Sequence, residues 1–214
     1  MADVQDLVHE LRLPEGEAAG ALVLMHGRGT SEQDLLPLLD VFDPRGRLVG
    51  AFPRAPLQLP PIGHHWYALE VGRPDPETFL ATADRLGAWL DGLAERTTIP
   101  IGRTVLGGFS QGAVMAWAMA LGPGRPRPAG VLAMSGFLPD VPGFDLRLES
   151  LDGLPVAITH GALDPVIPPA FGRDARDRLA AAGADVVHRE TDVPHILDPR
   201  VVPGVAQWLD RRFG

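Results

Sequence analysis

Two reactive residue types, cysteine and lysine, are missing from this 214-residue sequence. Without cysteine the chain has no disulfide, no thiolate nucleophile and no cysteine ligand for a metal. All 19 basic residues are arginines, which excludes Schiff-base chemistry and a phosphate-binding loop that needs a lysine. Asparagine is absent as well. The joint absence of lysine and asparagine fits either adaptation to heat or GC-rich coding.

Long apolar runs are also missing, because no stretch approaches the roughly 18 consecutive apolar residues of a membrane helix. The acidic N-terminal segment 1–6 has no apolar signal core, so we expect a cytoplasmic protein. The formal net charge of -8 argues against a nucleic-acid partner, since phosphate contacts require a basic face. The length of 214 residues predicts one domain that spans residues 1–214.

Apolar segments with strand character alternate with segments of helical periodicity along most of the chain. Residues 7–13 alternate between apolar and polar side chains and predict an antiparallel edge strand. Further predicted strands are 21–25, 47–52, 104–106, 129–134, 155–160 and 184–190, and predicted helices are 77–96, 113–120, 171–182 and 199–213. This order predicts an α/β fold with a mostly parallel central sheet covered by helices on both faces. Ligands of such sheets bind at the carboxyl ends of the strands.

The segment Gly108–Gly112, with the sequence GFSQG, contains the pattern G-x-S-x-G around Ser110. A predicted strand precedes it and a predicted helix follows it, which is the context of a nucleophile elbow. The serine of such a turn is strained, so both flanking positions favour glycine, which has no Cβ. The alternative is a glycine-rich strand end that only packs tightly. The strand and helix around the pattern favour Ser110 as a nucleophile.

A serine nucleophile needs a base and an orienting acid, and in this architecture they follow in the order Ser, Asp or Glu, His. Asp164 lies on a turn after the predicted strand 155–160, and His195 lies on a loop after the predicted strand 184–190. Asp192 and Glu190 are rival acids, but both are close to His195 in sequence and neither follows the expected strand turn. We therefore predict a catalytic triad of Ser110, Asp164 and His195.

An oxyanion hole for this serine needs two backbone N–H donors. The residue after the nucleophile, Gln111, supplies one, and we expect its side chain to matter little. The second donor should come from the loop after the strand 21–25, and we assign it to Arg28. His26 and His160 each precede a glycine at a strand end, so we expect them to orient the loops that carry Arg28 and Asp164.

The long loop from residue 52 to residue 67 mixes prolines with apolar and polar residues, as binding loops do. We expect Ile62 and Trp66 to line the substrate pocket; the alternative is that Trp66 and Tyr67 only anchor the loop. Further pocket candidates are Phe137, Val166 and Ile196. The adjacent His64 and His65 have no accompanying carboxylate cluster, so we predict no metal site.

Four separated motifs resemble those of the phospholipase/carboxylesterase family of α/β-hydrolases, which includes the acyl-protein thioesterases. They are LMHGRG at 24–29, GFSQG at 108–112, HGALDPVIP at 160–168 and PH at 194–195. The resemblance implies a small serine esterase or thioesterase with little or no cap domain, and it is compatible with a homodimer. The chemistry of the serine needs no cofactor. The Arg28–Gly29–Thr30 sequence departs from the acyl-protein thioesterase pattern, and residues 60–67 look more similar to the bacterial carboxylesterase branch.

These features together predict a serine carboxylester hydrolase that acts on small-molecule esters of short to medium chain length through an acyl-serine intermediate. An acyl-protein thioesterase or lysophospholipase would use the same residues. A non-catalytic α/β-hydrolase that binds a small molecule belongs to a different class, but it would not need the order Ser, Asp, His.

Overall fold

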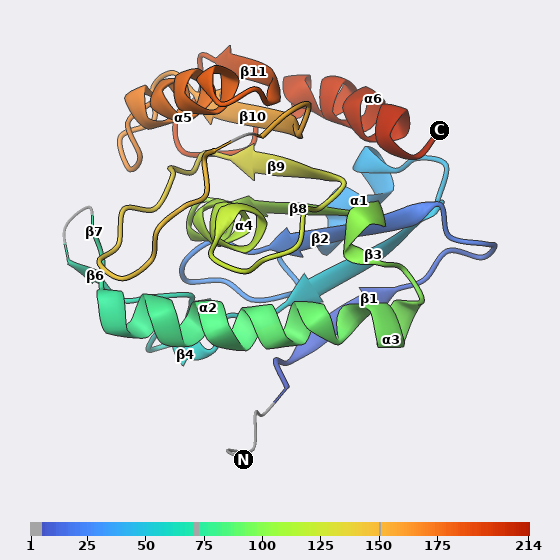
Figure 1. Cartoon of the computed structure of the whole chain (residues 1–214), viewed down its shortest axis with the longest axis horizontal. Coiled ribbons are helices and arrows are strands. Elements are labelled where there is room, and N and C mark those ends of the chain that lie inside the picture. The colour runs from blue at the N-terminus through green and yellow to red at the C-terminus, as the bar shows by residue number, and fades with distance from the viewer. Residues whose placement is uncertain (1–5, 71–72, 150) are drawn as a thin grey trace.

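The structure, a computed structural model, describes residues 6–70, 73–149 and 151–214. Within these residues a seven-stranded sheet has the order β1-β3-β2-β8-β9-β10-β11 (Figure 1). Only β1 is antiparallel to its neighbour, whereas the other neighbouring strands are parallel. The strands are β1 His9–Arg12, β2 Gly20–Met25, β3 Leu48–Pro53, β8 Thr104–Phe109, β9 Gly130–Met134, β10 Pro155–Gly161 and β11 Asp185–Thr191. The predicted α/β fold with an antiparallel edge strand is confirmed.

Helices cover both faces of this sheet (Figure 1). The helices α2 Pro76–Asp91, α4 Gln111–Leu121 and α5 Ala170–Ala181 share one apolar core, and α1 Leu36–Phe42 and α6 Val202–Phe213 share the other. Strand β2 contributes side chains to both cores. Val23 and Met25 pack in one core, and Leu22 and Leu24 pack in the other. A strand buried on both faces reads as a continuous apolar run, as this one does.

Two short hairpins and three short helical segments complete the fold. The hairpins pair β4 Leu57–Gln58 with β5 His64–His65 and β6 Leu69–Glu70 with β7 Arg73–Pro74. The helical segments are α3 Leu93–Thr97 and the 3-10 turns η1 Ile101–Arg103 and η2 Pro199–Val201. None of the described helices is long and apolar enough to cross a membrane. No large cap domain is evident in the described part of the chain.

The predicted helix 77–96 is wrong in one respect, because it is divided at Gly92. The apolar spacing continues through this point, but the Arg96 side chain folds back over Gly92 and its guanidinium donates to the Trp89 carbonyl. Helix α1 was absent from the predictions. It has only seven residues and no side-chain cap, so the sequence carries little helical signal there.

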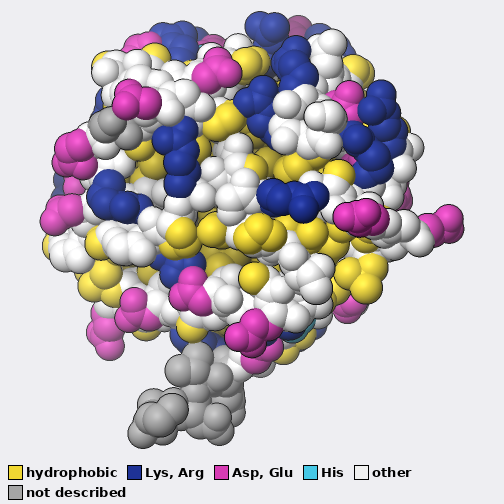
Figure 2. Space-filling model, turned by 45° about the vertical axis from the view of Figure 1, so that its right-hand side comes forward, with side chains coloured by type: hydrophobic (Ala, Val, Ile, Leu, Met, Phe, Trp, Pro, Cys, Tyr) yellow, Lys and Arg dark blue, Asp and Glu magenta, His cyan; other side chains and the backbone are white. Residues whose placement is uncertain are grey.

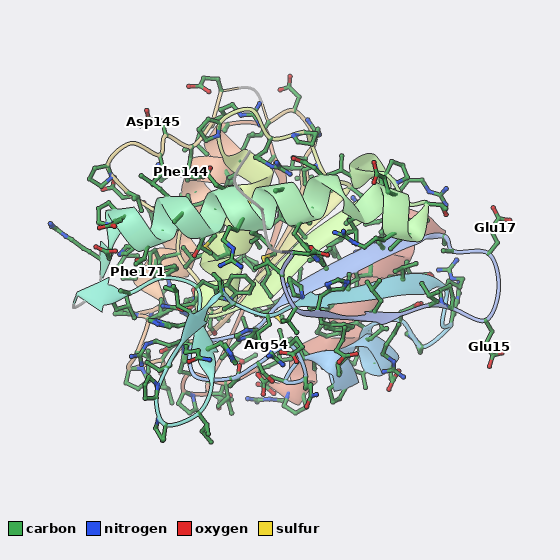
Figure 3. All side chains as sticks on the ribbon, turned by 90° about the horizontal axis from the view of Figure 1, so that it is seen from below. Glu15, Glu17, Arg54, Phe144, Asp145 and Phe171 are labelled. Carbon is green, nitrogen blue, oxygen red and sulfur yellow. The ribbon has the colours of Figure 1, made fainter. Side chains whose placement is uncertain are left out.

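The order of the strands reverses beside β2, because the chain leaves β2 for β3 on one side and later enters β8 on the other. Such a reversal opens a crevice at the carboxyl ends of the strands, where ligands of α/β sheets bind. The connection between β1 and β2, with Glu15 and Glu17 at its tip, lies at the opposite end of the molecule from Phe171 (Figure 3). The carboxyl end of the sheet is therefore where a site is expected.

Surface charges of both signs are interspersed on the face shown in Figure 2, with hydrophobic side chains between them. Ion pairs join several charges of the described residues, including Arg47 with Asp210 at 2.6 Å and Arg125 with Asp91 at 2.8 Å. The visible face does not have the single-sign basic surface that phosphate backbones require.

A close approach of α4 to the end of β2 sets the position of the turn between β8 and α4. A Cβ atom on Gly112 would lie 1.9 Å from the Met25 carbonyl oxygen, and one on Gly108 would lie 2.4 Å from the Gly112 backbone. Both distances are far below van der Waals contact, and the atoms involved are backbone atoms that cannot turn away. Only glycine fits at these two positions.

We predict that Gly112→Ala lowers the free energy of unfolding by about 3 kcal/mol or more, since the added methyl group forces the helix off the sheet. Gly204→Ala is the matched control, because Gly204 lies in α6 with no heavy atom within 4 Å of its Cβ position. In the control, the higher helix propensity of alanine should raise the free energy of unfolding by up to about 1 kcal/mol. Urea denaturation of both variants measures the difference, and equal midpoints would contradict the packing constraint.

Candidate active site

Ser110 occupies the turn between β8 and α4 with φ 55° and ψ -120°. This conformation is strained for a residue with a side chain. Its backbone N–H donates to the Met134 carbonyl oxygen at 2.9 Å, and its carbonyl accepts from the N–H groups of Ala113 and Val114. The surrounding hydrogen bonds thus hold the serine at the end of the strand, as expected for a nucleophile elbow.

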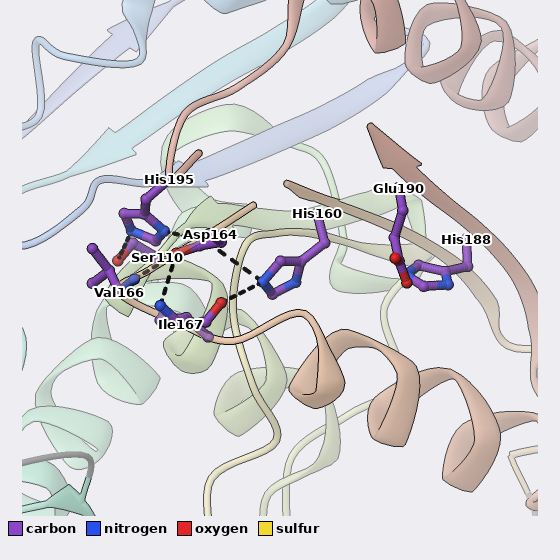
Figure 4. Close-up of polar contacts among 8 residues, drawn as sticks. All are labelled: Ser110, His160, Asp164, Val166, Ile167, His188, Glu190 and His195. Carbon is purple, nitrogen blue, oxygen red and sulfur yellow. Dashed lines mark hydrogen bonds and ion pairs between the residues drawn. The ribbon is translucent and has the colours of Figure 1, made fainter. Parts of the chain in front are cut away.

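Three side chains from three separate loops meet at this turn (Figure 4). The His195 Nε2 atom lies 2.9 Å from the Ser110 Oγ atom, and the His195 Nδ1 atom lies 2.6 Å from an Asp164 oxygen. An ionised carboxylate only accepts hydrogen bonds, so Nδ1 carries the proton and Nε2 is left to accept the serine proton. The His195 ring also packs on the Phe109 ring, with 4.9 Å between the centroids.

The second oxygen of Asp164 is held by its own loop. The backbone N–H groups of Val166 and Ile167 both donate to this oxygen at 2.8 Å. The His160 Nε2 atom lies 2.9 Å from the Ile167 carbonyl oxygen and 3.5 Å from the Asp164 oxygen that contacts His195. His160 therefore braces the loop that carries the carboxylate, in the position expected from the sequence.

The loops that carry Asp164 and His195 lie directly against each other at Gly161. A Cβ atom on Gly161 would lie 2.3 Å from the Pro194 carbonyl oxygen. The N–H groups of Ala162 and Leu163 donate to the carbonyl oxygens of Thr191 and Val193 at 2.6 and 3.1 Å. The glycine at this point lets the two loops approach closely enough for the carboxylate to reach the imidazole.

The rival acids from the sequence are occupied elsewhere. Glu190 pairs with Arg173 at 2.6 Å, and Asp192 pairs with Arg200 at 2.5 Å. Arg200 also binds Asp198 and lowers the pKa of that carboxyl to about 2. The carboxylate in contact with His195 is that of Asp164.

The loop after β2 lies beside Ser110. A Cβ atom on Gly27 would lie 3.7 Å from the Ser110 Cβ atom. Among the described residues, the N–H of Arg28 has no acceptor, while the N–H of the next residue, Gly29, donates to the His64 carbonyl oxygen at 2.8 Å. Gln111 is the first residue of α4, where N–H groups lack partners within the helix. Both candidate oxyanion donors are thus on segments that border the serine.

The mild effect expected for Gln111→Ala stays a prediction, but the structure shows contacts of the Gln111 side chain that the sequence does not indicate. This side chain is only 3% exposed and joins two loops. Its Oε1 atom accepts from the Trp66 N–H, and its Nε2 atom donates to the Tyr67 carbonyl, both at 3.0 Å. A buried amide with both ends bonded holds the loop 59–67 against the serine turn, because leaving either partner unsatisfied is costly.

The assignment of Trp66 to the pocket wall is wrong. Trp66 is fully buried, and its Nε1–H donates to the His26 carbonyl oxygen at 2.8 Å. The large apolar ring is more stable under the loop than exposed to solvent, so the alternative reading, in which Trp66 and Tyr67 anchor the loop, holds.

The other pocket candidates are accessible to different degrees. Ile62 is 83% exposed, Val166 64% and Ile196 50%, and the Val166 N–H donates to the Asp164 carboxylate (Figure 4). Phe137 lines a hollow of about 620 Å³ together with Arg73, Pro74, Asp75, Pro76, Leu138, Asp140, Pro142 and Phe171. The Phe137 and Phe171 rings pack at 5.5 Å between centroids. Phe171 is not among the predicted pocket residues, because its place at the start of a predicted helix does not indicate that it faces Phe137.

One buried ion pair near the site was also missed. Glu32 is 2% exposed, and both of its oxygens accept from the Arg54 guanidinium at 2.5 Å. Hydrogen bonding to Arg54 lowers the pKa of the Glu32 carboxyl. The pair ties the loop after β2 to the end of β3. No local pattern in the sequence connects positions 32 and 54.

His26 is a buried neutral histidine. Its Nε2 atom accepts from the Ala55 N–H at 3.0 Å, and its Nδ1 atom lies 2.7 Å from the Gly27 carbonyl oxygen. Burial lowers the pKa of His26 from 6.5 to about 4, despite the opposing effect of the hydrogen bond to Gly27. Elsewhere among the described residues, no group of three side chains could hold a metal ion.

Comparisons with known proteins show the family of this chain. Residues 8–211 match the family model Phospholipase/Carboxylesterase. The acyl-protein thioesterase 1 of Mycosarcoma maydis is 30% identical to this chain over 224 aligned residues. The alignment covers 89% of this chain and 90% of the thioesterase. The putative hydrolase MhqD of Bacillus subtilis is 26% identical over 194 residues, which cover 91% of this chain and 94% of MhqD.

Solved structures show the same fold. The Bacillus cereus carboxylesterase superimposes with a TM-score of 0.85 at 24% identity and covers 97% of this chain and 95% of its own. Esterase PE8 superimposes with a TM-score of 0.82 at 26% identity, and the superposition covers 96% of this chain and 99% of the esterase. The fold therefore defines an α/β-hydrolase. Within this class, the chain belongs to the phospholipase/carboxylesterase family.

The lowered pKa of His26 predicts a loss of stability in mild acid. Between pH 6.5 and about 4 the unfolded chain binds a proton at this ring and the folded chain does not. The neutral His26 ring therefore adds about 3 kcal/mol to the free energy of unfolding above pH 6.5. This contribution is lost as the pH falls to about 4. Urea denaturation at several pH values measures it. A His26→Asn variant should lack this part of the pH dependence, and identical slopes in the two proteins would contradict the prediction.

Proposed function

We propose that the protein is a serine carboxylester hydrolase that acts on short- to medium-chain esters with Ser110 as nucleophile, His195 as base and Asp164 as orienting acid. The observation that carries this proposal is the continuous hydrogen-bond chain from Ser110 through His195 to Asp164, at 2.9 and 2.6 Å. Membership in a family of esterases and thioesterases supports it. A non-catalytic binding protein would have no use for a strained serine aligned on an imidazole and a carboxylate.

In the acylation step, the Ser110 Oγ atom attacks the ester carbonyl carbon while its proton moves to the His195 Nε2 atom. The carbonyl oxygen gains the negative charge. The bond from carbon to the leaving oxygen then breaks, and the alcohol departs with the proton from Nε2. Asp164 stabilises the imidazolium in between and keeps the proton on Nδ1, which leaves Nε2 free to accept.

In the deacylation step, a water molecule attacks the acyl-serine and gives its proton to the His195 Nε2 atom. The proton returns to the Ser110 Oγ atom as the acid leaves, so the enzyme is restored. In both steps the negative oxygen is expected between the N–H groups of Arg28 and Gln111, with the N-terminal end of α4 adding a favourable dipole. The chemistry uses only side chains and backbone groups of this chain and water.

The substrate range is inferred from the surroundings of the serine. The Val166 N–H binds the Asp164 carboxylate, and we assign the acyl chain to the hollow of about 620 Å³ that Phe137 and Phe171 line, whose lining includes none of the three triad residues. This volume lies within the usual range for small-molecule sites, about 300–1,000 Å³. Cytoplasmic location and a homodimeric state stay predictions.

An acyl-protein thioesterase is the second candidate, because relatives with that name are 24 to 30% identical to this chain. The same triad would cleave a thioester by the same two steps. The two candidates differ in the length of the acyl chain and in the leaving group rather than in the catalytic residues.

Substitutions in the triad test the mechanism. Ser110→Ala and His195→Ala should each lower kcat by about 10⁴-fold or more, and Asp164→Asn by about 10⁴-fold because the imidazole takes the wrong tautomer. Asp192→Asn is the matched control, since Asp192 contacts Arg200 instead of the imidazole. Steady-state hydrolysis of a nitrophenyl ester measures all four. An Asp164→Asn protein that keeps most of its activity would show that the acid is misassigned.

A chain-length series separates the two candidate functions. For the esterase we expect kcat/KM to peak at short to medium acyl chains and to fall towards palmitoyl, because methylenes outside the hollow stay in water and gain no burial energy. Matched oxygen esters and thioesters from acetyl to palmitoyl provide the comparison. A steep rise in kcat/KM towards palmitoyl thioesters would favour the thioesterase instead.

A further inference from the structure

The peptide bond between Gly27 and Arg28 carries two groups that face opposite ways. A trans peptide unit is planar, so its C=O and N–H bonds point in opposite directions. The Gly27 carbonyl and the Arg28 N–H belong to the same unit. Whatever fixes the direction of the carbonyl therefore fixes the direction of the N–H that the proposed oxyanion hole requires.

Two side chains bind this carbonyl. The His26 Nδ1 atom lies 2.7 Å from the Gly27 oxygen, and the Thr30 hydroxyl donates to the same oxygen at 3.1 Å. Among the described residues the Arg28 N–H on the other side of the unit has no acceptor. The carbonyl of this peptide unit is bound by two donors, whereas its N–H has no acceptor among the described residues. The N–H is therefore available to an acceptor from outside the chain.

The tautomer of His26 is fixed by its other nitrogen. The Ala55 N–H can only donate, so the Nε2 atom at 3.0 Å from it must accept. A neutral ring that accepts at Nε2 carries its proton on Nδ1 and donates it to the Gly27 carbonyl. Burial of the ring keeps it neutral, as the pKa of about 4 shows.

The ring itself cannot shift easily. His26 is fully buried, and the Trp66 ring packs against it with 5.3 Å between the centroids. Trp66 is held in turn by the Gln111 side chain, which belongs to the residue that offers the second oxyanion donor. The two candidate donors are thus connected through buried hydrogen bonds.

We propose that His26 is a positioning residue that locks the Gly27–Arg28 peptide through the Gly27 carbonyl, so that the Arg28 N–H faces the oxyanion formed at Ser110. Without the Nδ1 donor, only the Thr30 hydroxyl holds the Gly27 carbonyl. The peptide then rotates more easily and can present its carbonyl oxygen, which would repel the developing negative charge. This inference rests on the proposed ester hydrolysis. His26 does not touch the substrate and acts only through the backbone.

Two conservative substitutions separate this function from general support of the fold. The amide nitrogen of Asn reaches the position of Nδ1, so His26→Asn keeps the donor to Gly27 and loses the acceptor for Ala55. The amide oxygen of Gln reaches the position of Nε2, so His26→Gln keeps the acceptor and loses the donor. Each variant keeps one of the two hydrogen bonds, and a merely structural role would make them equally impaired.

We expect His26→Gln to lower kcat about tenfold to a hundredfold with KM unchanged, somewhat less than the complete loss of an oxyanion donor. Its affinity for an alkyl boronic acid, which forms a tetrahedral adduct with the serine, should fall by the same factor. His26→Asn should keep kcat within about threefold of the native value, since the Arg28 donor stays in place. Equal losses of kcat in both variants, or a larger loss in His26→Asn, would overturn the proposal.

Thr30 offers a second test that leaves the His26 ring unsubstituted, and its hydroxyl also lies 3.2 Å from the His26 Nδ1 atom. Thr30→Val removes one donor to Gly27 and keeps the shape, so kcat should fall severalfold with KM unchanged, and Thr30→Ser should restore it. The proposal would be overturned if Thr30→Val left kcat unchanged and the two His26 variants were folded and as active as each other. Failure of the native protein to hydrolyse any ester would instead contradict the proposed function itself, so the two failures are distinguishable.

Discussion

The backbone of Ser110, with φ at 55°, lies in a region that residues with side chains rarely occupy, at a cost of about 1–3 kcal/mol. The turn persists because α4 is pressed against the end of β2, where a single methyl group on Gly112 would meet the Met25 carbonyl oxygen. Helix α4 is buried along its whole length, and this burial offsets the strain. Every other feature of the site is arranged around the hydroxyl that this turn presents.

Three loops converge on that hydroxyl, and each is held by a polar side chain that has no part in the proposed chemistry. His160 braces the loop of Asp164, and Asp198 with Arg200 fixes the chain after His195. His26 and the Glu32–Arg54 pair hold the loop after β2. Such support is needed because backbone donors and triad atoms work only within a few tenths of an ångström of their proper places. These polar groups therefore hold the loops that carry the proposed catalytic groups.

Much of this arrangement could be predicted from the sequence. The strand before and the helix after GFSQG and the order Ser, Asp, His follow from local patterns, and the structure brings Ser110, Asp164 and His195 together. Glycine at positions 108, 112 and 161 was informative because close backbone approach leaves a local signature.

The errors concern contacts between distant segments. Trp66 and the Gln111 side chain meet across 45 residues, so no local pattern shows that the tryptophan is buried and the amide is bonded. The same holds for Glu32 and Arg54. The break at Gly92 depends on how one arginine folds back on its own helix. Periodicity describes which face of an element is buried, but it does not describe which side chains hold the loops.

The most direct measurement is the intact mass of the protein after treatment with a fluorophosphonate, with the Ser110→Ala variant beside it. Only a serine activated by its imidazole reacts rapidly with this reagent. We expect one adduct on the native chain and none on the variant. A native, folded protein that forms no adduct, or a variant that still forms one, would show that Ser110 is not the activated nucleophile.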